Sequence, residues 1–134
     1  MANVLILEDD PGIRHVATEM LRAAGFGVFP TGSVPEALTL VTSGLSVDAV
    51  VMDLMLHGAS SAPFLRTIRK ITRYQRTPIV LATGAEPARG LFPPADLYQV
   101  LLRKPYRMSA LVDTILALTG RMETKTSGRA HEPA

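Results

Sequence analysis

The sequence predicts an α/β domain: three layers, with a doubly wound, five-stranded parallel sheet covered by helices on both faces. Two observations predict it. Short apolar runs that suit strands alternate along the chain with longer segments whose apolar residues recur every three or four positions, as in helices. Runs such as residues 4–7 are also continuously apolar, which is typical of parallel strands buried on both faces. A strand–helix alternation of this kind favours a parallel sheet between two layers of helices.

The first half of the chain alternates strands with helices. The expected strands are residues 4–7, 28–29 and 47–52. The first helix begins at Pro11 and ends before Gly25, a residue that suits a left-handed C-terminal cap. Ser33 and Glu36 have the spacing of a capping box, so we expect the second helix to begin after Ser33, and Gly44 ends it.

The second half completes the sheet but contains one irregular region. The expected elements are a loop at residues 54–60, helices at 64–71 and 108–118, and strands at 79–82 and 100–102. Glycines and prolines interrupt the stretch before the last strand, at Gly84, Pro87, Gly90, Pro93 and Pro94. Because proline inside a helix removes a hydrogen bond and clashes with the preceding turn, we expect the fourth helix to be short or distorted, with a restart at Pro94.

Length and composition indicate one small domain. With 134 residues, the chain is predicted to fold as a domain over residues 1–120, followed by a disordered tail over 121–134. The absence of cysteine excludes disulfides, zinc–thiolate sites and thiol catalysis. A net charge of +2 does not by itself indicate nucleic-acid binding. No signal peptide and no apolar run of roughly 20 residues is present, so we expect a soluble, cytoplasmic protein.

Charged and hydroxyl side chains stand at the carboxyl ends of the expected strands. They are Glu8, Asp9 and Asp10 after the first strand, Asp53 after the third, Thr83 after the fourth and Lys104 after the fifth. In an open parallel sheet these ends share one edge, where ligands bind. Clustered carboxylates suit a divalent cation, and a hydroxyl and an ammonium beside them suit a phosphoryl group in transfer. For Asp10 we favour the role of cap for the following helix, or support of its neighbours.

With these residues the chain resembles the receiver domains of two-component response regulators, in particular the single-domain, chemotaxis-regulator type. The resemblance is carried by the segments LILEDDPGIR, VVMDLML, PIVLATG and LLRKPY, and it covers residues 3–119. It implies a flavodoxin-like fold with strand order 2-1-3-4-5. It also implies a response regulator that accepts a phosphoryl group from a phosphohistidine donor in a magnesium-dependent reaction, and then changes conformation to signal to a partner.

The resemblance implies a role for each matched residue. Asp53 corresponds to the phosphoryl acceptor, while Thr83 and Lys104 correspond to the hydroxyl and ammonium that contact the phosphoryl group. The implied Mg²⁺ ligands are Glu8, Asp9, Asp53 and the backbone carbonyl of Met55. Positive charge is needed because a carboxylate attacking a phosphate is an anion meeting an anion. The protein would be a switch that phosphorylates and dephosphorylates itself rather than a metabolic enzyme.

Several positions depart from the family pattern. His57 and Ser61 stand where the family usually has proline and glycine, and Gly84 replaces a small alanine. We expect His57 to be a solvent-exposed loop histidine. Leu101 occupies the switch position that is commonly tyrosine or phenylalanine. The aromatic half of the family's output mechanism is therefore missing, while its hydroxyl half is present.

The expected partners follow from the resemblance. They are a sensor histidine kinase or histidine phosphotransfer protein and an unknown output protein, with no membrane and no DNA binding; a monomer and a weak dimer both stay open. A basic stripe on the third helix consists of Arg66, Arg69 or Lys70, and Arg73, with Arg76 beyond. We favour a solvated outer face for this stripe over a surface for an acidic partner or nucleic acid.

Two other functions compete with phosphorylation. The chain could be a receiver-fold scaffold that binds a partner whether or not it is phosphorylated, which the missing aromatic at Leu101 favours and the intact set of strand-end residues opposes. Phosphatases with an aspartyl nucleophile use a second aspartate two positions later, and this chain has Met55 there. A flavin-binding relative would need a phosphate-cradling loop after the first strand, where this chain has acids.

Overall fold

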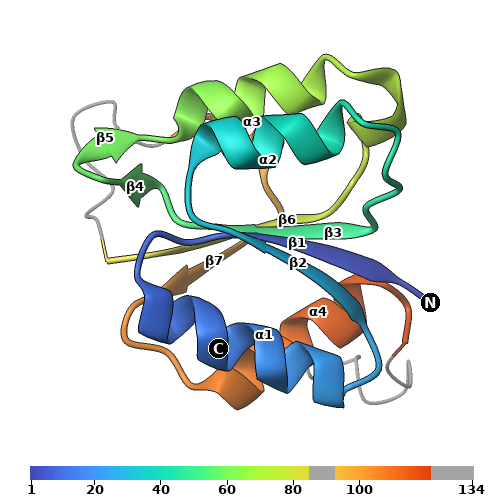
Figure 1. Cartoon of the computed structure of the whole chain (residues 1–134), viewed down its shortest axis with the longest axis vertical. Coiled ribbons are helices and arrows are strands. Elements are labelled where there is room, and N and C mark those ends of the chain that lie inside the picture. The colour runs from blue at the N-terminus through green and yellow to red at the C-terminus, as the bar shows by residue number, and fades with distance from the viewer. Residues whose placement is uncertain (85–92, 122–134) are drawn as a thin grey trace.

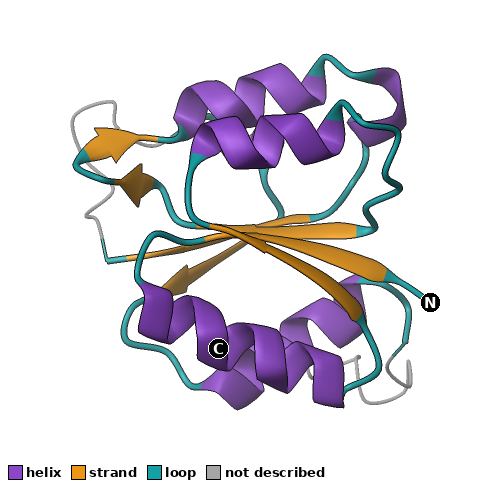
Figure 2. Cartoon of the chain, viewed as in Figure 1, coloured by secondary structure: helices purple, strands orange, loops and turns teal. Residues whose placement is uncertain are grey.

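The computed structural model of the chain describes residues 1–84 and 93–121 and has three layers (Figures 1 and 2). The sheet strands are β1 (Asn3–Leu7), β2 (Gly27–Thr31), β3 (Ala49–Met52), β6 (Ile79–Thr83) and β7 (Val100–Arg103). The helices are α1 (Pro11–Ala23), α2 (Val34–Val41), α3 (Ala62–Arg69) and α4 (Met108–Leu118). The five strands are parallel in the order β2-β1-β3-β6-β7, which is the expected order 2-1-3-4-5 when only these strands are numbered.

The sheet separates two hydrophobic cores. Helices α2 and α3 cover one face, and α1 and α4 cover the other (Figure 1). Because alternate side chains of a strand point to opposite faces, Leu5 and Leu7 lie in the core under α2 and α3, while Val4 and Ile6 lie in the core over α1 and α4. All four are at most 1% exposed, which explains why the strand is apolar at every position.

The helix starts follow the predicted capping residues. Asp10 caps α1, because its Oδ1 accepts a hydrogen bond of 3.0 Å from the Ile13 N–H. Ser33 caps α2 by accepting from the Glu36 N–H at 3.4 Å. The reciprocal half of the capping box is shifted by one residue, since Glu36 Oε1 accepts from the Gly32 N–H at 2.7 Å. The predicted caps are thus confirmed, with this one change of partner.

Strand β2 forms one edge of the sheet and is longer than the two predicted residues. The Gly27 N–H donates to the carbonyl of Ala2, so Gly27 faces β1. Alternation along the strand then directs the backbone groups of Val28 and Pro30 outward. The outward carbonyl of Val28 accepts a hydrogen bond of 3.2 Å from Arg22 Nη2, a residue of α1.

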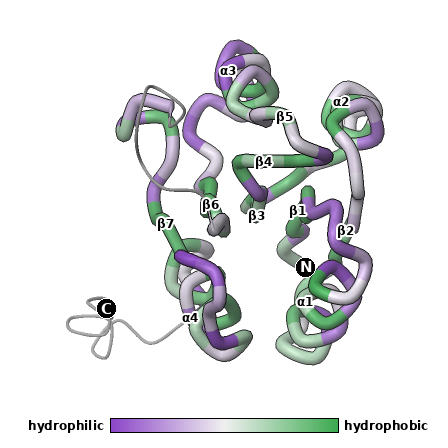
Figure 3. The backbone as a smooth tube through the Cα atoms, turned by 90° about the vertical axis from the view of Figure 1, so that its left-hand side faces the viewer, coloured by the Kyte–Doolittle hydropathy of each residue, from purple (hydrophilic) through white to green (hydrophobic). Residues whose placement is uncertain are grey.

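A small hairpin replaces the loop expected at residues 54–60. Strands β4 (Met55–Leu56) and β5 (Ala59–Ser60) pair antiparallel beyond the end of β3 (Figures 1 and 3). The two residues between them, His57 and Gly58, have φ angles of 49° and 81°. A two-residue turn with both residues in the left-handed region matches the right-handed twist of the flanking strands. The expectation of a loop over the whole of residues 54–60 is therefore wrong.

Arg69 contradicts the prediction that the basic stripe of α3 is a solvated face. Its Nε and Nη2 donate to the carbonyl of Leu97, at 3.1 and 2.9 Å, and Nη1 donates to the carbonyls of Tyr74 and Thr77, at 2.9 and 2.8 Å. Nη2 also contacts Gln99 Oε1 at 3.2 Å. We call this set the Arg69 cluster. The basic residues near it that do remain exposed are Arg66, Lys70, Arg73 and Arg76.

The region before β7 contains a short 3₁₀ helix, η2 (Ala95–Leu97), directly after Pro94, as the predicted restart required. A second 3₁₀ helix, η1 (Thr72–Tyr74), follows α3. The rest of the predicted fourth-helix region (85–92) and the predicted tail (122–134) lie outside the described residues. Within residues 1–84 and 93–121, every helix is too short or too polar to cross a membrane.

Candidate functional site

The structure brings the strand-end residues together at one edge of the sheet. Glu8 and Asp9 follow β1, Asp53 follows β3, Thr83 ends β6 and Lys104 follows β7. Figure 3 looks onto this edge, with the strand ends between the two layers of helices. We call Glu8, Asp9, Asp53 and Lys104 the acidic site. The fold thus brings these side chains together, as the sequence predicted.

Lys104 lies between two buried carboxylates. Its Nζ donates to Glu8 Oε1 at 2.8 Å and to Asp53 Oδ2 at 2.7 Å. Glu8 is 4% and Asp53 is 7% exposed, so both interactions are shielded from water. Buried charges need such partners, because the cost of removing an isolated ion from water is several kcal/mol or more. With Asp9 included, three carboxylates face one ammonium, and negative charge remains in excess.

The pKa values of Lys104 and Glu8 reflect burial and these hydrogen bonds. Burial alone would lower the pKa of Lys104, but hydrogen bonds to Asp53 and Glu8 outweigh it and raise the pKa to about 12. Burial raises the pKa of Glu8 above its ordinary value, although Lys104 acts in the opposite direction. Lys104 therefore stays charged at neutral pH. The energetic cost of burying charge at this site is borne by the ionised carboxylate of Glu8.

Backbone amides hold the carboxylates in place. Asp53 Oδ1 accepts from the Met55 N–H at 3.1 Å, and Glu8 Oε2 accepts from the Asp10 N–H at 3.0 Å. Both Asp53 and Glu8 thus use one oxygen for an amide and the other for Lys104. Charge-assisted hydrogen bonds of this kind fix the orientation of an ionised side chain. The site is preorganised by the turns that follow its strands.

The three carboxylates fit a divalent cation. One oxygen from each of Glu8, Asp9 and Asp53 can be chosen so that all three lie within 4.8 Å of one another. Magnesium binds through one or two carboxylates together with waters and phosphate oxygens. The donor set is therefore of the right chemistry and compactness for the expected ion. Met55 directly follows the site at the start of β4, and a ligand role for its carbonyl stays a prediction.

Thr83 lies beside Lys104, as the sequence predicted. The hydroxyl residue is 1% exposed at the end of β6, and its carbonyl accepts the backbone N–H of Lys104 at 3.1 Å. A Cβ atom placed on the neighbouring Gly84 would lie 3.8 Å from the Lys104 Cβ, an ordinary contact. Glycine in place of the family's alanine is thus not forced by packing, and it leaves space at this edge.

Ser61 supports Asp53 in a way that the sequence did not reveal. Its hydroxyl donates to the Asp53 carbonyl at 2.5 Å, and its backbone N–H donates to the Leu54 carbonyl at 2.7 Å. Ser61 is 1% exposed and precedes α3. Its departure from the glycine usual in the family was the one available signal, but that signal did not indicate a partner.

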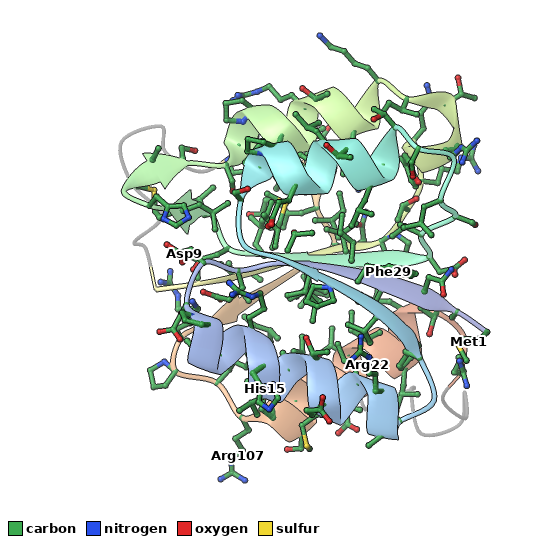
Figure 4. The ribbon with its side chains drawn as sticks, viewed as in Figure 1. Met1, Asp9, His15, Arg22, Phe29 and Arg107 are labelled. Atoms are coloured by element: carbon green, nitrogen blue, oxygen red, sulfur yellow. The ribbon has the colours of Figure 1, made fainter. Side chains whose placement is uncertain are left out.

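The β4–β5 hairpin closes one side of the acidic site. The His57 N–H donates to Asp9 Oδ2 at 2.8 Å, and this hydrogen bond lowers the pKa of Asp9. The His57 ring reaches the loop before α2, where Nε2 lies 3.1 Å from the Gly32 carbonyl oxygen. Figure 4 shows Asp9 at the edge of the sheet on the side of this hairpin. His57 is exposed, as expected, yet it is held in place from two sides.

Comparisons with known proteins agree with this fold. The family model described as response regulator receiver domain matches residues 4–116. The DNA-binding response regulator MtrA of Mycolicibacterium smegmatis is 32% identical over 124 residues, which is 90% of this chain and 51% of MtrA. The sensor kinase CckA of Brucella abortus is 31% identical over 115 residues, which is 85% of this chain and 12% of that protein.

Solved structures agree as well. The chemotaxis response regulator CheY4 of Vibrio cholerae is 25% identical, with a TM-score of 0.78, covering 88% of this chain and 98% of CheY4. The chain spans about half the length of MtrA, the curated relative named above. The matched residues include every residue of the acidic site and all the described sheet strands and α-helices, except the first residue of β1 and the last two of α4. The chain therefore belongs to the receiver-domain family of two-component response regulators.

Proposed function

We propose that this receiver domain accepts a phosphoryl group from a phosphohistidine donor onto Asp53, in a magnesium-dependent reaction, and changes conformation to signal to a partner protein. One observation carries the proposal: the buried Asp53 carboxylate lies 2.7 Å from Lys104 Nζ at an edge where two further carboxylates gather. An aspartate with only a structural role would not require a lysine and two further carboxylates around it. Together these groups suit the transfer of an anion to an anion.

In the proposed transfer, one carboxylate oxygen of Asp53 forms a bond to phosphorus while the phosphorus–nitrogen bond of the donor histidine breaks. The electron pair of that bond stays on the imidazole nitrogen of the donor. Lys104 keeps its proton throughout, since its pKa is raised to about 12, and offsets negative charge at the acceptor. Thr83, which ends the strand beside Lys104, would contact the phosphoryl oxygens through its hydroxyl.

Glu8, Asp9 and Asp53 would hold the magnesium ion, with the carbonyl of Met55 as a further ligand. When bound, the ion supplies positive charge that reduces the repulsion between the carboxylate and the incoming phosphate. The acidic site favours binding of a cation, because Lys104 offsets only part of its negative charge. Cytoplasmic location and a histidine kinase or phosphotransfer protein as donor belong to the same proposal.

The proposed output is a change of surface that a partner protein recognises. Because the chain corresponds to about half of MtrA, the DNA binding in the name of MtrA is a statement about that protein, and the absence of DNA binding here stays a prediction. Leu101 lies half-buried against the core under α2 and α3 and has no aromatic ring. The rival is therefore a scaffold whose partner binding ignores phosphorylation.

The test is intact-mass measurement after incubation with magnesium and acetyl phosphate, for the wild-type chain, Asp53→Asn and Asp113→Asn. Asp113 is an exposed carboxylate on α4 and serves as the matched control. We expect a gain of one phosphoryl group in the wild type and in Asp113→Asn, and none in Asp53→Asn. Labelling that persists in Asp53→Asn would overturn the assignment. Absence of labelling in the wild type, also with a histidine kinase as donor, would favour the scaffold.

A further inference from the structure

His57 makes a set of contacts that the proposed phosphorylation does not use. Its ring Nδ1 lies 3.9 Å from Asp9 Oδ2, while its ring Nε2 lies 3.1 Å from the Gly32 carbonyl oxygen. The side chain is nevertheless 67% exposed, so ions in solution can reach it. Its backbone N–H contacts the same Asp9 oxygen at 2.8 Å. The imidazole is thus positioned beside a carboxylate and open to solvent.

The contact with Gly32 fixes which ring nitrogen can bind a ligand. A carbonyl oxygen only accepts hydrogen bonds, so Nε2 of His57 must carry the hydrogen in this contact. In the neutral ring the lone pair is then on Nδ1, which lies toward Asp9. Histidines that bind metal ions commonly donate their other N–H to a carbonyl or carboxylate in the same manner, which fixes tautomer and orientation.

The spacing and the surroundings fit a shared ion. Nitrogen and oxygen ligands of zinc each lie about 2.0–2.2 Å from the ion, so two of them can be separated by as much as ~4 Å. The 3.9 Å between His57 Nδ1 and Asp9 Oδ2 is within that limit but about 0.5 Å wider than the ~3.4 Å between two tetrahedral ligands, so the exposed imidazole ring turns slightly toward Asp9 when it binds the ion. On this side of Asp9 an open hollow of about 460 Å³ is lined by Asp9, Glu36 and His57, which leaves room for water ligands. Arg14 also lines the hollow, and its Nη1 is engaged by the Glu8 carbonyl, to which it donates at 2.7 Å.

The ligand types point to a class of ion. Magnesium and calcium prefer oxygen ligands, whereas imidazole suits zinc, nickel, copper and iron. His57 is not part of the group of carboxylates that lie within 4.8 Å of one another. Its ring nitrogen would therefore add a ligand at Asp9 from outside that group. We propose that Asp9 and His57 form a position for a divalent transition-metal ion, beside the magnesium position of the acidic site. The inference rests on the proposed function only in that Asp9 serves both ions.

The test compares zinc and magnesium binding, by calorimetry, in the wild type, His57→Asn and His57→Gly. Both replacements tolerate the left-handed backbone, at φ 49°, and both keep the backbone N–H that contacts Asp9. His15→Asn is the matched control, because His15 is an exposed histidine on α1 (Figure 4). Nitrogen-15 NMR of the wild-type histidine rings identifies the nitrogen that zinc contacts.

We expect zinc affinity to fall at least about tenfold in both His57 variants, since even residues that only orient a ligand change affinity on that scale. Magnesium affinity should stay within about twofold in all variants, and zinc should shift the Nδ1 resonance of His57. Zinc affinity that is unchanged in the His57 variants would overturn the inference. So would an equal loss for zinc and magnesium, because His57 would then act only through the placement of Asp9.

The two proposals fail separately in these experiments. If the His57 variants bind zinc normally and Asp53 is still labelled with acetyl phosphate and magnesium, only the transition-metal position is wrong. If zinc binding depends on His57 and the wild type is not labelled, only the proposed phosphorylation is wrong.

Discussion

Two cationic side chains stabilise opposite ends of the same sheet. Lys104 lies at the carboxyl ends of the strands and contacts the carboxylates of Glu8 and Asp53. Arg69 lies near the amino ends of β6 and β7 and, among the described residues, contacts only neutral oxygens of the backbone and of Gln99. One end is a cluster of charges, and the other is a cationic clamp on carbonyl groups.

The difference shows which end can respond to ions. Hydrogen bonds to carboxylates raise the pKa of Lys104 to about 12, whereas burial among neutral groups lowers the pKa of Arg69. A cation that enters the acidic site offers its carboxylates an alternative partner to Lys104. The carbonyls around Arg69 are committed to a planar guanidinium, which presents several donors at once. The contacts of Lys104 can therefore rearrange when a cation binds, whereas the contacts of Arg69 are expected to stay the same.

The largest effect is expected from Arg69→Met, which keeps the length of the side chain but removes every donor. Four carbonyls lose a charged partner, those of Leu97, Tyr74, Gln75 and Thr77. We expect a loss of about 2–4 kcal/mol in the free energy of unfolding. Urea denaturation measures it. Arg66→Met, on an exposed position of the same helix, should change stability by less than ~0.5 kcal/mol. Similar values for the two variants would show that the Arg69 cluster does not stabilise the fold.

An intermediate effect is expected from Lys104→Met in the absence of magnesium, because Glu8 and Asp53 are left buried without a cation. The loss is about 1–2 kcal/mol, below the ~3–5 kcal/mol of a fully buried pair, because the Lys104 side chain is 21% exposed. Urea denaturation with and without magnesium separates the two ends of the sheet. Magnesium should stabilise Lys104→Met more than it stabilises the wild type, and it should stabilise Arg69→Met no more than the wild type. An equal response of both variants to magnesium would show that the two ends of the sheet do not differ in their response to ions.

The smallest effect is expected from Glu8→Gln, and it depends on pH. Burial raises the pKa of Glu8 above 4.5, so the ionised side chain is disfavoured in the folded state. This cost is absent below the ordinary pKa, and it is complete above the raised pKa. Without magnesium, the wild type should therefore lose stability relative to Glu8→Gln as the pH rises from 4.5 to neutrality. Thermal unfolding of the wild type and Glu8→Gln at both pH values measures this difference in stability. If the wild type instead gained stability relative to Glu8→Gln as the pH rises, burial of the ionised Glu8 would not destabilise the fold.

The carboxyl edge of the sheet could be predicted because its residues are attached to strands. An apolar run specifies where a strand ends, and parallel strands bring their ends together, so the sequence placed Asp53 near Lys104 although 51 positions separate them. Asp10 was also recognisable, since a helix cap depends on a local spacing. The chemistry of these side chains then indicated the kind of site.

The Arg69 cluster and the hairpin could not be predicted, for different physical reasons. Helical periodicity indicates which face a residue occupies, but not how deeply a long side chain reaches, and the Leu97 partner of Arg69 is 28 positions away. The hairpin has strands of two residues each, too short for any periodic pattern. Its contact with Asp9 joins residues 48 positions apart in the chain. Such contacts follow from tertiary packing and leave no local signal.

The outer edge of β2 has a consequence for aggregation. An unpaired edge strand presents a row of donors and acceptors to which a strand of another chain can add. In β2 the outward groups belong to Val28 and Pro30, and Pro30 has no N–H to donate. Arg22 already occupies the Val28 carbonyl, at 3.2 Å. One amide hydrogen and the Pro30 carbonyl are left on the outer side of the strand, so the β2 edge of the sheet offers an intruding strand little to pair with.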